Sequence, residues 1–63
     1  MNPKPNEIKE ARRNAGLTQK NAASLIGYHL RAWQMWEKGD RVMRRLLFDV
    51  WLQKLKENNE RYR

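Results

Sequence analysis

Apolar residues recur three and four positions apart along most of this chain, the spacing that gathers side chains on one side of an α-helix. No stretch alternates polar and apolar residues as a half-buried β-strand does. Val, Ile and Thr, which favour strands, are scarce. The pattern therefore predicts an all-α protein.

Polar caps and glycines mark the first two helices. Asn6 is placed to cap the first, and Gly16 ends it as the left-handed residue past its C-terminus. Thr18 caps the second, QKNAASLI, which Gly27 ends. Residues 2–5 contain two prolines and are expected to form an extended arm before the first helix.

Two further helices complete the prediction. One spans residues 29–38 and ends at Gly39, and the longest spans residues 43–57. A chain of 63 residues makes one domain, which buries only ~60% of the surface that its unfolded form exposes. We therefore expect residues 1–63 to form a single compact four-helix domain. Its three-helix core spans residues 6–39 and contains a helix-turn-helix.

Charge and composition limit the classes of function. Fourteen Lys and Arg against seven Asp and Glu give a net charge of +7, which favours a polyanionic partner, nucleic acid first and anionic membrane second. Without cysteine, and with His29 as the only histidine, no metal or other cofactor is expected. No catalytic constellation or glycine-rich phosphate loop is present, so we expect no enzyme. No apolar leader or membrane span is seen, which predicts a cytoplasmic protein without membrane contact.

The segment 29–38 has two different sides. Trp33 and Trp36, three residues apart, share the side expected in the core. The opposite side carries Leu30, Arg31, Gln34, Met35 and Lys38. A solvated polar side would account for the tryptophans, but not for a leucine and a methionine among the polar groups. The major groove of DNA offers hydrogen-bond acceptors and thymine methyl groups together, and such a mixed side suits it.

The chain around this segment resembles the lambda-repressor-like, or XRE-type, helix-turn-helix family. The matching residues are Arg12, Gly16-Leu17-Thr18-Gln19, Ala23, Gly27 and Trp36-Glu37-x-Gly39. The resemblance covers residues 6 to about 45. It implies a transcriptional regulator that binds double-stranded DNA at a palindromic operator, as a homodimer and usually as a repressor. Small phage and mobile-element members, including anti-CRISPR-associated autorepressors and antitoxins, are similar.

The resemblance also assigns roles to individual residues. Base contacts fall on Leu30, Arg31, Gln34 and Met35. Arg31 suits guanine and Gln34 suits adenine, because both side chains can form bidentate hydrogen bonds with these bases. The family positions for phosphate contacts fall on Gln19, His29 and Lys38. The basic residues that follow, Arg41, Arg44 and Arg45, are expected to contact phosphates through their charge. Where the family usually has Ser or Thr this chain has His29, a poorer helix cap.

Two further features of the family pattern concern the interior. Arg12 and Glu37 match a pair that links the first and third helices, so we expect a structural ion pair rather than a DNA contact. Ala22 stands where the family usually has a large aliphatic residue, and Trp33 and Trp36 are expected to fill that volume.

The last helix carries two apolar stripes. Met43, Leu46, Leu47, Val50, Trp51 and Lys54 form the first, which is expected to close the core. Phe48, Leu52 and Leu55 form the second, which is expected to stay exposed and to bind a second copy of the chain. Two alternatives remain: an antitoxin or other interaction module that binds a protein partner through this helix, and a basic binder of RNA or anionic membrane.

Overall fold

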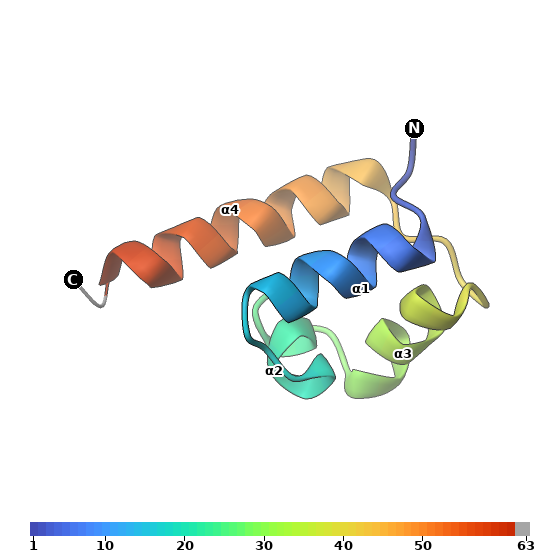
Figure 1. The fold of residues 1–63 in the computed structure, drawn as a ribbon, viewed down its shortest axis with the longest axis horizontal. Helices are drawn as coiled ribbons and strands as arrows, with labels where there is room; N and C mark the ends of the chain where they lie inside the picture. The colour runs from blue at the N-terminus through green and yellow to red at the C-terminus, as the bar shows by residue number, and fades with distance from the viewer. Residues whose placement is uncertain (62–63) are drawn as a thin grey trace.

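Four α-helices make up the part of the chain that the structure describes, as the spacing of its apolar residues predicts (Figure 1). The structure, a computed structural model, describes the backbone of residues 1–61 and the side chains of residues 1–58. The helices are α1 (Pro5–Asn14), α2 (Gln19–Ser24), α3 (Leu30–Lys38) and α4 (Arg45–Arg61). The predicted all-α, four-helix fold is confirmed. Over the described residues no helix combines the length and the apolar character needed to cross a membrane.

The start of α1 differs from the prediction. The helix begins at Pro5, and the extended Lys4 rather than Asn6 is its N-cap. The Lys4 backbone N–H donates to a carboxylate oxygen of Glu7 at 3.4 Å. Proline fits the first helical position because its φ is already helical and the N–H that it lacks would have no partner there. The cap predicted at Asn6 is therefore wrong.

The helix-turn-helix is formed by α2, the turn after it and α3. Thr18 caps α2 as predicted, because its hydroxyl accepts a hydrogen bond from the Asn21 N–H at 3.1 Å. The turn passes through Gly27, whose φ of 72° is unfavourable for residues with a side chain. There the Tyr28 N–H donates to the Ala23 carbonyl at 3.0 Å. His29 occupies the N-cap of α3 without a hydrogen bond from its side chain to the helix.

A cluster of aromatic rings holds the helices together. The buried hydrophobic core consists of Ile8, Ala22, Ala23, Ala32, Trp33, Trp36, Met43, Phe48 and Trp51. The Trp33 ring lies 5.6 Å from that of Trp36 and 5.2 Å from that of Trp51. The Trp51 indole N–H donates to the Ala22 carbonyl at 3.0 Å. The space beside the small Ala22 is therefore occupied by a side chain of α4, which the sequence-based interpretation did not include.

The beginning of α4 is held by the N-terminal arm. The helix starts at Arg45 rather than Met43, and Met43 is buried in the segment before it. The side-chain oxygen of Asn2 accepts a hydrogen bond from the Arg45 backbone N–H at 2.9 Å, so that the arm caps a helix 43 residues further along the chain. At its other end α4 runs to Arg61, four residues beyond the predicted end and past the end of α1 (Figure 1).

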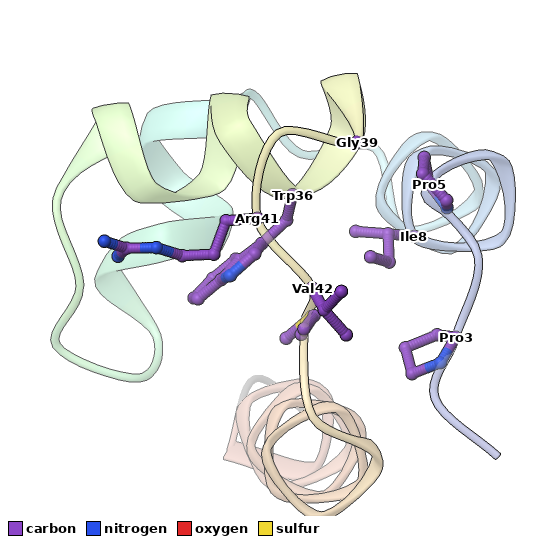
Figure 2. A pocket seen from close by; sticks show the side chains of 8 residues that line it. Pro3, Pro5, Ile8, Trp36, Gly39, Arg41 and Val42 are labelled. Carbon is purple, nitrogen blue, oxygen red and sulfur yellow. The ribbon is translucent and has the colours of Figure 1, made fainter.

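The arm, α1 and the segment before α4 surround a small apolar hollow of about 100 Å³ (Figure 2). Pro3 and Ile8 line it from one side and Val42 from the other. The predicted extended arm is present as residues 1–4, and it packs against the domain, because Pro3 is buried. The arm is thus part of the folded domain.

The buried face of α4 matches the prediction only in part: Trp51 is buried as expected, but several other residues are not placed as expected. Phe48 is only 3% exposed and Leu55 packs against the core, whereas Leu46 is 77% exposed. Val50 and Leu52 are 43% and 40% exposed. The uncovered stripe predicted at Phe48, Leu52 and Leu55 is therefore wrong for Phe48 and Leu55. Phe48 and Trp51 share one side of the helix, and aromatic rings gain more from burial than leucine or valine do.

Candidate nucleic-acid interface

The polar side of α3 is exposed, as the sequence predicts. Leu30 is 40% exposed, and Arg31, Gln34 and Lys38 are also exposed. The opposite side of the same helix consists of buried residues, Ala32, Trp33 and Trp36. Met35 is half-buried at the flank of the exposed side. Four of the five side chains expected on this side are thus available together, and Met35 only partly.

Glu37, on the flank of α3, joins three helices. Its carboxylate accepts hydrogen bonds from Arg12 Nε at 2.6 Å, Arg12 Nη2 at 3.2 Å and Gln19 Nε2 at 3.0 Å. The indole N–H of Trp33 donates to the same carboxylate. The predicted Arg12–Glu37 ion pair is confirmed. We call these four residues the Glu37 cluster, which fixes α3 to both α1 and α2.

The two charged groups of the Glu37 cluster are shielded from solvent and hydrogen-bonded. The Glu37 side chain is 5% exposed and that of Arg12 is 14% exposed. Arg12 also donates to the Leu17 carbonyl at 2.9 Å. Burial alone would raise the pKa of Glu37, but the hydrogen bonds from Arg12, Trp33 and Gln19 and the charge of Arg12 outweigh it and lower the pKa below 4.5. Glu37 is therefore ionised near neutral pH.

Gln19 lies at the start of α2 as predicted, but its side chain also binds within the domain. It is half-buried, and its amide nitrogen donates to Glu37 instead of pointing freely outward. An amide nitrogen has two hydrogens, so one remains available to a phosphate. Gln19 is thus the member of the Glu37 cluster that lies nearest the surface at the start of α2. Its predicted phosphate contact remains a prediction.

Of the other predicted phosphate contacts, four have exposed side chains and one, Arg45, is half-buried. His29, Lys38, Arg41 and Arg44 are exposed around α3 and the segment that follows it. Lys38 lies 3.8 Å from the Asp40 carboxylate in an exposed ion pair, which is worth little in water. The Arg41 side chain points away from Pro5 and Ile8 (Figure 2).

Arg45 is not among the freely available basic residues. It is the first residue of α4, and its Nε donates to the Met1 carbonyl at 2.7 Å. Its guanidinium lies 3.7 Å from the Glu7 carboxylate and 5.5 Å from the centre of the Phe48 ring. We therefore assign Arg45 to holding the arm on α4, and the predicted phosphate contact is not supported.

Tyr28 was not singled out from the sequence. Its ring lies 5.1 Å from that of Trp36, and it is 43% exposed directly before His29. Tyr28 also lines an open groove of about 320 Å³ together with Arg44, Leu46, Leu47 and Val50. Its place directly after the turn glycine Gly27 could have drawn attention to it. The neighbouring sequence does not indicate which helices the ring contacts.

Comparison with known proteins does not place the chain in a family. No protein-family model matches the chain, and no curated protein sequence matches it either. The resemblance to XRE-type proteins therefore remains a prediction, and the function has to be argued from α3 and its surroundings.

Proposed function

We propose that the protein binds double-stranded DNA in a sequence-specific manner and regulates transcription in the cytoplasm, as a binding protein rather than an enzyme. The observation that carries this proposal is the exposed side of α3. It presents Leu30, Arg31 and Gln34 on a helix that the Glu37 cluster holds to α1 and α2. A helix held so firmly can keep its donors in one register against a DNA duplex.

The chemistry of this side fits the major groove. An α-helix with its side chains is about 10–12 Å across, so a B-DNA major groove about 12 Å wide admits α3. Arg31 can donate two hydrogen bonds to guanine, and Gln34 can donate to and accept from adenine. Leu30 and the exposed part of Met35 supply apolar contacts for thymine methyl groups. His29, Lys38, Arg41 and Arg44 supply positive charge for the phosphates around the groove.

We predict that Arg31→Ala relaxes base preference at one position of each half-site, at a cost of about 1–3 kcal/mol. The measurement is the affinity for a duplex from upstream of the protein's own gene and for a series in which each base pair of that duplex is changed. Arg13→Ala, an exposed arginine on α1, is the matched control. Equal weakening of Arg31→Ala on every duplex would make Arg31 a phosphate contact instead.

Salt should weaken binding steeply if basic side chains contact phosphates. Each such contact contributes about 0.9 to the slope of log affinity against log salt. Lys38→Ala, Arg41→Ala and Arg44→Ala should each lower the slope by about this amount, and the exposed Lys56→Ala on α4 should not. A wild-type affinity that hardly changes with salt would contradict these contacts.

A second candidate function is a protein-interaction module, such as an antitoxin. It is supported by the exposed apolar residues Leu46 and Val50 on α4. Copurification of an acidic protein together with failure to prefer any duplex sequence would favour it. Binding to any nucleic acid or to anionic vesicles without sequence preference would instead favour a nonspecific basic binder.

A further inference from the structure

The segment that joins α3 to α4, residues 40–44, is held at three points. At its start the first backbone N–H of the segment donates to the Met35 carbonyl at 3.0 Å. In its middle the Met43 side chain is buried. Directly after it the Arg45 N–H, the first of α4, donates to the Asn2 side chain in the N-terminal arm. The exposed side chains of the segment therefore start from a fixed backbone.

Arg44, the last residue of this segment, occupies a helix position that normally supplies a side-chain acceptor. Its carbonyl accepts a hydrogen bond from the Phe48 N–H at 3.0 Å, as the carbonyl of an N-cap residue does. N-cap residues are usually Ser, Thr, Asp or Asn, because their side chains accept a hydrogen bond from the first turn of the helix. An arginine side chain has only donors and cannot do this. Asn2 supplies the acceptor instead, at 2.9 Å from the Arg45 nitrogen.

We propose that Asn2 is a positioning residue for Arg44, which contacts a phosphate of the bound duplex from the start of α4. The proposal rests on the proposed DNA binding. Arg44 is exposed and lines the same groove as Tyr28, two residues before α3, so its side chain leaves the domain near the start of α3. Without the acceptor from the arm, the first turn of α4 would fray, and Arg44 would lose its fixed starting point.

The chemistry of this cap suits a surface that meets phosphates. An aspartate would cap the helix as well as an asparagine does, but its negative charge would repel a nearby phosphate. Asn2 caps α4 without adding charge. Arg45, the other arginine at this end of the helix, is held by the Met1 carbonyl and the Glu7 carboxylate. Arg44 is therefore the arginine at the start of α4 that can reach a phosphate.

Amide hydrogen exchange of the full chain tests the cap without DNA. Asn2→Leu keeps a side chain of similar shape but removes the acceptor, so the Arg45 amide proton should exchange about fivefold faster. Asn2→Asp keeps an acceptor oxygen and should retain the slow exchange of wild type. Asn6→Leu, the same change at an exposed position of α1, is the matched control. Equal exchange of the Arg45 amide in Asn2→Leu and wild type overturns the proposal.

The salt dependence of DNA binding tests the positioning itself. Arg44→Ala should lower the slope of log affinity against log salt by about 0.9, and Asn2→Leu should lower it by part of that amount. In a chain that already carries Arg44→Ala, Asn2→Leu should leave the slope unchanged, because the charge that it positions is gone. Asn6→Leu should leave the slope unchanged in both backgrounds. A purely structural role of Asn2 would reduce the folded fraction without changing the slope for the folded protein.

The outcomes separate the positioning of Arg44 from the proposed function. If salt weakens the binding of Asn2→Leu as steeply as that of wild type, or if Asn2→Leu lowers the slope equally with and without Arg44, the proposal is overturned while DNA binding stands. An unchanged slope for Arg44→Ala also overturns it, because Arg44 then contacts no phosphate. If wild type binds no duplex although the Arg45 amide responds as expected, the proposed DNA binding fails, and the positioning role fails with it.

Discussion

Glu37→Ala is expected to lower the free energy of unfolding by about 3 kcal/mol, because it leaves a shielded arginine without its counterion. Arg12 is 14% exposed and receives two of its three hydrogen-bond acceptors from Glu37. The donors of Gln19 and Trp33 lose the same acceptor. Unfolding in urea measures the change, and binding of α3 to DNA should weaken with it.

Glu57→Ala provides the matched control for this effect. Glu57 is an exposed glutamate on α4 that lies 3.9 Å from Lys54, so its loss should cost under about 1 kcal/mol. A cycle with Arg12→Ala and the double variant isolates the coupling between Arg12 and Glu37. If Glu37→Ala and Glu57→Ala unfold at the same urea concentration, the Glu37 cluster contributes nothing to stability.

The contribution of Glu37 should also depend on pH. The hydrogen bonds and charge around Glu37 lower its pKa in the folded protein below the ordinary 4.5. Because the pKa of Glu37 is lower in the folded protein than in the unfolded chain, ionised Glu37 stabilises the fold fully above pH 4.5. This stabilisation is lost as the pH falls through the pKa of Glu37 in the folded protein. The difference in unfolding free energy between wild type and Glu37→Ala should therefore shrink on acidification below about pH 4.5. A difference that stays constant down to pH 3 would show that the neutral carboxyl group serves equally well.

Local chemistry made most of the helices predictable. The cap at Thr18 and the turn at Gly27 depend only on residues close to them in the chain, and both lie where the sequence predicts them. Trp33 and Trp36 fix the buried side of α3 through their spacing alone. The exposed set on α3 followed from the same periodicity, and the Arg12–Glu37 pair followed from the family resemblance.

Contacts between distant residues account for what the sequence did not predict. The start of α4 depends on Asn2, 43 residues away, and no local cap indicates it. Both stripes of α4 have helical spacing, so periodicity could not decide which one is buried. The buried face takes Trp51 from the first stripe and Phe48 from the second, because the Trp51 indole N–H donates to the Ala22 carbonyl and the Phe48 ring stacks against that of Trp51. This rotation leaves Leu46 and Val50, which the sequence assigned to the core, on the surface.

Trp51→Ala is expected to unfold a large fraction of the protein. Removing a fully buried tryptophan costs about 3–5 kcal/mol, and a domain of this size has only about 3–9 kcal/mol in total. Trp51 is 0% exposed and its ring meets those of Trp33 and Phe48 at 5.2 and 6.0 Å, so its loss separates α4 from the rest of the core. Circular dichroism during urea unfolding should show a transition far below that of wild type.

Two further variants separate packing from hydrogen bonding at Trp51. Trp51→Phe keeps an aromatic ring but leaves the Ala22 carbonyl without its donor, which should cost about 1–3 kcal/mol. Leu52→Ala, at the next position and 40% exposed, should cost less than about 1 kcal/mol. If Trp51→Ala unfolds cooperatively at nearly the same urea concentration as Leu52→Ala, α4 does not close the core. The three preceding helices would then have to fold without it.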